Sequence, residues 1–177
     1  MAENPIADLV AGFQDAVAQV PEFVQPLIVA AAGAVPFIEG EGGAIVGVVG
    51  GLPPVVAGLA AAVGNMLCVF VVVVVAARAR GAIVNRARAD ADAADAAVAD
   101  EKPRSKGRER FQRWLVRFGV PGASLLGPLA LPTHFTAATL VATGVPVRRI
   151  LFWQALAIVL WTTIATVSVS LAVALAT

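Results

Sequence analysis

The feature that most constrains this chain is an apolar stretch of 24 residues, Pro54 to Ala77, that contains no charged side chain. As an α-helix, such a stretch extends about 36 Å, which exceeds the hydrocarbon core of a bilayer, about 30 Å thick. A second stretch, Ile150 to Thr177, is also free of charge and long enough to cross. The sequence therefore predicts an all-α integral membrane protein with two membrane-spanning helices.

The composition of the whole chain supports a membrane location. Of its 177 residues, 59% are hydrophobic and only 14% are charged, whereas soluble domains have about 25% charged residues. The first residues, MAENPIADL, carry acids where a secretory signal peptide has a basic region, so we expect no removable signal. The single cysteine, Cys68, cannot form an internal disulfide and is expected to pack as a small apolar side chain.

Basic residues predict the orientation of the chain in the membrane. Eleven of the 13 Lys and Arg residues lie between Arg78 and Arg117, and the other two are Arg148 and Arg149. Because Lys and Arg favour the cytoplasmic side, the first span runs inward, the second runs outward, and both termini lie outside. We interpret Arg148 and Arg149 as topological anchors, with contact to lipid headgroups as the second interpretation.

Two further apolar segments, Gln25 to Gly51 and Gly119 to Gly144, are interrupted by many glycines and prolines. A continuous transmembrane helix with so many breakers would leave backbone groups unpaired in lipid, at several kcal/mol each. Each segment is instead predicted to form a re-entrant hairpin with arms of about 10 residues, whose tip lies near the bilayer midplane.

The two hairpins precede their spans from opposite sides of the membrane, as an inverted repeat requires. A short sequence similarity supports the repeat. Each span is preceded by a similar segment, and the two segments, Gly51-Leu52-Pro53-Pro54 and Gly144-Val145-Pro146-Val147, are offset by 93 residues. The same offset carries Glu41 onto His134, the only histidine. A chance similarity is the alternative explanation.

The predicted organisation has four parts. Residues 1–24 form an amphipathic helix, either at the membrane interface or packed on the protein. Residues 25–84 form the first repeat, 85–110 a cytoplasmic low-complexity linker, and 111–177 an amphipathic segment with the second repeat. Six acidic residues within the basic stretch reduce its net charge to +5, which argues against nucleic-acid binding.

Glu39 and Glu41 occupy the predicted tip of the first hairpin, and His134 lies in the second hairpin. Broken backbone at membrane depth must face protein or water, so we expect a wet cavity. Two neighbouring carboxylates there repel each other and can share a proton, which a bound cation would displace. His134 is either a proton relay or a structural hydrogen-bond partner. The alternative for Glu39 and Glu41 is the exposed mouth of a shallow hairpin.

Three further residues complete the candidate site. Asn65, inside the first span, would hydrogen-bond to a hairpin tip or to substrate, or pin two helices together. Trp153 and Trp161 would form aromatic walls for a cation, or else anchor at the interface or pack in the bundle.

One histidine and one cysteine cannot furnish a closed zinc site, and no catalytic triad or phosphate-binding loop stands out. We therefore expect no enzyme activity, metal or cofactor.

Several sequence segments together resemble the bacterial small multidrug export family of integral membrane proteins. They are PFIEGEGGAIVGVVGGLPP, AAAVGNM, LLGPLALPTH and GVPVRRILFWQALAIVLW, and the resemblance covers roughly Ala30 to Ala172. More distantly, the plan of paired hairpins and spans resembles the DedA or VTT superfamily of lipid and polyprenyl-phosphate transporters. Two departures matter. Glu41 stands where many relatives have an arginine, and no Arg or Lys, the residues suited to lipid phosphate, lies between Gly119 and Val147.

The residues and the resemblance together favour a small secondary transporter for proton-coupled export of cationic or amphipathic small molecules. Its partners would be the substrate, protons, membrane lipids and a second copy in a homodimer. A DedA-like lipid or polyprenyl-phosphate flippase is the first alternative. A membrane adaptor or subunit that docks through the linker is the second.

Overall fold

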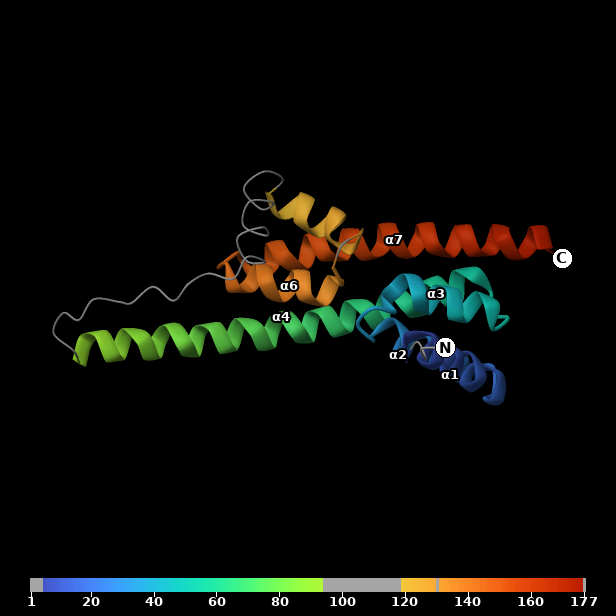
Figure 1. Cartoon of the computed structure of the whole chain (residues 1–177), viewed down its shortest axis with the longest axis horizontal. Coiled ribbons are helices and arrows are strands. Elements are labelled where there is room, and N and C mark those ends of the chain that lie inside the picture. The colour runs from blue at the N-terminus through green and yellow to red at the C-terminus, as the bar shows by residue number, and fades with distance from the viewer. Residues whose placement is uncertain (1–4, 94–118, 130, 177) are drawn as a thin grey trace.

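The computed structural model describes residues 5–93, 119–129 and 131–176 (Figure 1). The described ranges are helices joined by turns and contain no strand, which confirms the all-α prediction. The helices are α1 (Pro5–Gln19), α2 (Gln25–Gly33), α3 (Glu39–Val49), α4 (Pro54–Ala93), the 3-10 helix η1 (Gly127–Leu129), α6 (Thr133–Ala142) and α7 (Val147–Ala176). Residues 119–126 are also helical. Most of the predicted linker and of the amphipathic segment after it lies outside the described residues.

Two long helices, α4 and α7, form the scaffold and run in opposite directions (Figure 1). By length and composition, Pro54–Ala87 and Val147–Ala176 are each able to cross a membrane, as predicted. The helix α4 continues to Ala93 and so includes the first nine residues assigned to the linker. The alanine-rich sequence after Asn85 explains this extension, because alanine and arginine have high helix propensity and no proline follows before Pro103.

The apolar side chains of both long helices are largely exposed. Only 28% of the apolar window of α4 and 17% of that of α7 is buried, whereas the core helix of a soluble protein is mostly buried. On α4 one row of exposed residues recurs at every fourth position, and Val56, Phe70 and Ile83 are exposed as well; the row comprises Val55, Leu59, Val63, Leu67, Val71 and Val75. This apolar surface is consistent with a membrane location.

The helices α2 and α3 form a pair that packs against α4 through very small residues. A Cβ atom on Gly64 of α4 would overlap the carbonyl oxygen of Ala30 in α2, and one on Gly33 would overlap that of Ala61. The predicted breakers do end helices here, since a turn with Pro36 separates α2 from α3 and Gly51, at φ +90°, separates α3 from α4. At Gly33 and Gly64, the absence of a side chain therefore lets the backbones of α2 and α4 approach each other closely.

The first helix, α1, contacts α2 and α3 through one face. Val17 is fully buried there in an apolar core with Val29, Val46 and Leu52. Of the two interpretations of this segment, packing on the protein is therefore observed. An interfacial position of the outer face of α1 stays a prediction.

The helix α6 packs on α4 and α7 and has its own apolar core. Leu140, Ile150 and Val73 are fully buried in that core. At the end of α6, Gly144 has φ +88°, and a Cβ atom there would lie 2.9 Å from a guanidinium nitrogen of Arg80. Arg80 thus lies at the carboxyl end of α6, where the helix dipole favours a cation. The side chains of Arg148 and Arg149 are exposed at the start of α7.

Candidate functional site

The first turns of α3 and α6 meet through the carboxylate of Glu39. Its Oε1 accepts hydrogen bonds from the backbone N–H of Thr133 at 2.6 Å and from the Thr133 hydroxyl at 2.8 Å. The Nδ1 atom of His134 lies 3.1 Å from the same oxygen. Because an ionised carboxylate only accepts, Nδ1 is the donor when Glu39 is ionised. All three residues are buried, with at most 6% of each exposed.

Glu39 caps a helix that has no cap of its own. The residue before α6 is Pro132, and no side chain adjacent in sequence accepts from the first turn. Helix amino ends carry unpaired N–H groups and a partial positive charge. Glu39 lies in the first turn of α3 and faces the first turn of α6, so both dipoles stabilise its negative charge. This contact joins two segments that are 94 residues apart.

Asn65 and Thr162 place this contact near the middle of the charge-free part of α4, Pro54 to Ala77, and near the middle of α7. The Thr133 hydroxyl lies 3.3 Å from Oδ1 of Asn65, which is 11 residues after Pro54 and 13 before Arg78. Thr162 is the sixteenth of the 30 residues of α7. A Cβ atom on Gly40 would overlap the Thr162 hydroxyl and lie 3.5 Å from Nδ2 of Asn65. We call Glu39, Asn65, Thr133, His134 and Thr162 the tip cluster.

The backbone before α3 is strained. Phe37 and Glu39 have φ of +74° and +54°, and they are the non-glycine residues with positive φ in the part of the chain that the structure describes. Such conformations cost about 1–2 kcal/mol per residue, so the surrounding contacts must hold them. The ring of Phe37 packs on that of Phe135 in α6, with centroids 5.9 Å apart. Contacts of Phe37 and of Glu39 to α6 therefore hold this strained segment at two points.

A pocket of about 220 Å³, here called the acid pocket, opens beside the tip cluster. It is lined by Phe37, Ile38, Glu39, Glu41, Pro128, Leu129 and Trp161, a set without Lys or Arg. The indole of Trp161 is fixed by a hydrogen bond from Nε1 to the carbonyl of Leu125 at 2.8 Å. Two carboxylates with an aromatic wall favour a cationic ligand.

Several buried polar atoms around the site have no hydrogen-bond partner among the described residues. They are Oε2 of Glu41, Nδ2 of Asn65, Nε2 of His134, Oγ1 of Thr162 and Thr136, Oγ of Ser124, and both side-chain polar atoms of Gln154. Buried polar groups in proteins almost always have a partner. This concentration distinguishes the interior from an ordinary apolar helix interface and suits a region that receives water, protons or ligand.

The structure brings together most of the predicted site residues. Glu39, Asn65 and His134 belong to the tip cluster, while Glu41 and Trp161 line the acid pocket. The contact to His134 is made by Glu39, whereas the offset of 93 residues aligned His134 with Glu41. Trp153 lies apart from the pocket and packs against the core of α6 and beside Phe152.

Sequence reasoning missed Thr133 and Thr162. A threonine between a proline and the single histidine, at the start of a helix, was an available signal for Thr133. Thr162 gave no signal, because only packing against Gly40 singles it out. Among the described residues, no group of three or more His, Cys, Asp or Glu side chains is arranged so that it could hold a metal ion.

Comparisons of this chain with protein-family models, with curated proteins and with solved structures found no match.

Proposed function

We propose that this chain is a small secondary transporter of the bacterial inner membrane that exports organic cations in exchange for protons. The observation that carries the proposal is the buried contact of Glu39 with Thr133 and His134, beside a pocket that also contains Glu41. Ionisable groups near the middle of membrane helices are costly and mark ion or substrate pathways.

In this proposal the pair α2–α3 and the segment from 119 to the end of α6 are re-entrant hairpins of an inverted repeat. Two observations support this arrangement: α4 and α7 run in opposite directions (Figure 1), and α3 meets α6 beside the charge-free part of α4 and the middle of α7. The linker is cytoplasmic, and both termini are outside. Two copies associate as a homodimer, because one protomer has few helices with which to enclose a substrate path.

The two carboxylates have different tasks. Glu39 is occupied by three donors, whereas Oε2 of Glu41 has no partner in the described structure. Glu41 is therefore the group at which a proton and a cation compete. A proton that reaches Glu39 removes the charge that attracts His134 and the α6 dipole. The contact between the hairpins then weakens, which lets one hairpin move relative to the other.

Transport is tested with purified protein in liposomes that hold a pH-sensitive dye and an acidic interior. Addition of dodecyltrimethylammonium, at a concentration that leaves the liposomes intact, is expected to accelerate the loss of the pH gradient. Glu41→Gln is expected to slow this cation-dependent flux about tenfold, which corresponds to about 1.4 kcal/mol. Glu22→Gln, at an exposed position between α1 and α2, serves as the matched control and is expected to leave the flux unchanged.

The proposal fails if the wild-type protein shows no cation-dependent proton flux. Accelerated translocation of a fluorescent polyprenyl phosphate, without proton coupling, would favour the flippase alternative instead. Unchanged flux in Glu41→Gln together with a loss of function on deletion of the linker would favour the adaptor.

The proposed topology predicts opposite accessibility at the two ends of the scaffold. In a Cys68→Ser background, Ala176→Cys is expected to react with an impermeant maleimide on intact spheroplasts. Ala89→Cys, which is exposed on α4 beyond the apolar span, is expected to react only after permeabilisation. Labelling of both positions from the same side would rule out antiparallel spans in the membrane.

A further inference from the structure

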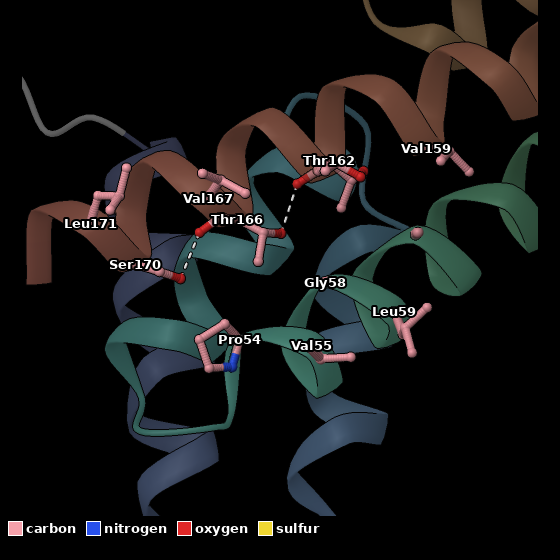
Figure 2. Close-up of a pocket in the computed structure, with 12 residues that line it drawn as sticks. Pro54, Val55, Gly58, Leu59, Val159, Thr162, Thr166, Val167, Ser170 and Leu171 are labelled. Atoms are coloured by element: carbon pink, nitrogen blue, oxygen red, sulfur yellow. Dashed lines mark hydrogen bonds between the residues drawn. The ribbon is translucent and has the colours of Figure 1, made fainter. Parts of the chain in front are cut away.

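An apolar groove of about 430 Å³ runs between the first part of α4 and the second part of α7 (Figure 2). Val55, Leu59 and Ala62 line it on α4, and Val159, Val167 and Leu171 line it on α7. From Pro54 to Ala62 the groove follows about 12 Å of helix. It contains no charged side chain. Its occupant must therefore be apolar along most of its length.

The hydroxyl groups in the groove do not make it polar. Thr166 donates to the carbonyl of Thr162 at 2.7 Å, and Ser170 donates to the carbonyl of Thr166 at 2.7 Å (Figure 2). Both hydroxyl hydrogens are thus used within α7. The Thr162 hydroxyl, which has no partner among the described residues, lies against Gly40, and Thr163 also lines the groove, so the lining is mainly but not wholly apolar.

One end of the groove adjoins the acid pocket. Thr162 lines the groove and is 2% exposed, and its hydroxyl lies against Gly40, between the two acids Glu39 and Glu41. Trp161, the preceding residue of α7, lines the acid pocket. Two consecutive residues of α7 therefore line the acid pocket and the groove, with Trp161 in the first and Thr162 in the second.

We infer that the substrates are single-chain amphipathic cations, whose ammonium head binds in the acid pocket while the alkyl tail lies in the groove. This inference rests on the proposed transport function and names its substrate class. Charge complementarity selects the head, and the uncharged groove accepts a flexible chain that enters sideways from the lipid between α4 and α7.

A helix of a second copy fits the groove less well than an alkyl chain. The α4 and α7 helices already touch at its floor, where a Cβ atom on Gly58 would lie 2.8 Å from the Thr166 hydroxyl. Small residues that let helices approach closely are thus already used within the protomer. An α-helix with side chains is about 10–12 Å wide, whereas an alkyl chain needs only the space between neighbouring side chains.

The test uses dodecyltrimethylammonium with a diazirine at the chain end, bound to the full-length protein in liposomes and irradiated. Mass spectrometry is expected to find labels on Val55, Leu59, Val167 or Leu171 at least fivefold above those on Leu67 and Leu156, which are exposed outside the groove. An excess of unlabelled dodecyltrimethylammonium is expected to remove the groove labels. Ala62→Leu, which fills the inner end, is expected to reduce them severalfold, whereas Val63→Leu, outside the groove, is not.

Several outcomes would overturn the inference. Equal labelling inside and outside the groove would place the tail in bulk lipid. Groove labelling by a diazirine phospholipid that the cation does not displace would assign the groove to membrane lipid. Covalent linkage of two copies through the groove would assign it to a second protomer.

The proton flux assay separates this inference from the proposed function. One result would overturn the tail site and leave transport standing: proton flux is driven by the compact cation tetraethylammonium, and the diazirine form of dodecyltrimethylammonium does not label the groove. Groove labelling without any cation-driven proton flux would support the tail site and overturn proton-coupled transport.

Discussion

Replacement of Glu39 by alanine is expected to lower the free energy of unfolding by about 3 kcal/mol or more, because each buried group left without its partner costs about 1–3 kcal/mol. The change leaves the N–H and the hydroxyl of Thr133 and Nδ1 of His134 without their acceptor. A buried donor without an acceptor lowers the free energy of unfolding, because water does not replace the lost hydrogen bond. Unfolding in mixed micelles with increasing dodecyl sulfate measures the loss.

Two companion variants separate the charge of Glu39 from its backbone strain. Glu39→Gln keeps a side-chain oxygen in place and is expected to cost less than Glu39→Ala. Glu39→Gly is expected to be about 1 kcal/mol more stable than Glu39→Ala, because glycine adopts the φ of +54° without a Cβ clash. In an ordinary helix alanine is the more stable of the two. An alanine variant that is more stable than the glycine variant would show that the tip is not strained in solution.

A double-mutant cycle tests whether Glu39 and His134 act as a pair. His134→Ala and Glu39→Ala are expected to be strongly non-additive, because either change alone removes their mutual bond. Additive losses would refute the contact between Glu39 and His134, and with it the mechanism in which a proton on Glu39 releases α6.

The second large effect is expected for Gly64→Ala. The added methyl would overlap the backbone carbonyl of Ala30, which is part of α2 and cannot rotate away. Overpacking of this kind costs about 3 kcal/mol, and here it would push α2 and α3 away from α4. We expect a corresponding loss of resistance to dodecyl sulfate and a loss of the Glu39 contact, measured as faster amide exchange at Thr133.

Gly81→Ala is the matched control for Gly64→Ala. Both glycines lie within α4, but a Cβ atom on Gly81 would meet nothing within 4 Å. This substitution is therefore expected to be neutral or to stabilise the helix by up to about 1 kcal/mol. Equal destabilisation by the two changes would contradict the tight crossing of α2 and α4.

The short helices illustrate how far local sequence information reaches. Pro36, Gly50 and Gly51 interrupt apolar segments, and the chain does break into α2, α3 and α4 near these residues. Backbone preferences of proline and glycine are local, so they are legible in sequence. The helical start of the linker was missed because alanine-rich helix propensity competes there with low complexity, and no apolar face distinguishes helix from coil.

The candidate site illustrates the opposite case. An acid pair in a breaker-rich apolar segment and a lone histidine could be singled out from sequence, but their partners could not. Whether Glu39 or Glu41 would face His134 depended on a left-handed φ at Glu39 and on the crossing of four helices. Thr133 and Thr162 contribute through contacts with residues 94 and 122 positions away in the chain.

The sequence by itself determined the two long apolar helices, the broken segments beside them and the isolation of a few ionisable residues within apolar surroundings. These properties follow from hydropathy and backbone preference, which act over one or two helical turns. Only the tertiary structure decided that Glu39 caps α6, that Glu41 and Trp161 share a pocket and that Thr162 adjoins an apolar groove. Those contacts depend on how the helices cross, and glycines at the crossings decide how closely the helices approach. The hydropathy periodicity of the sequence does not contain this information.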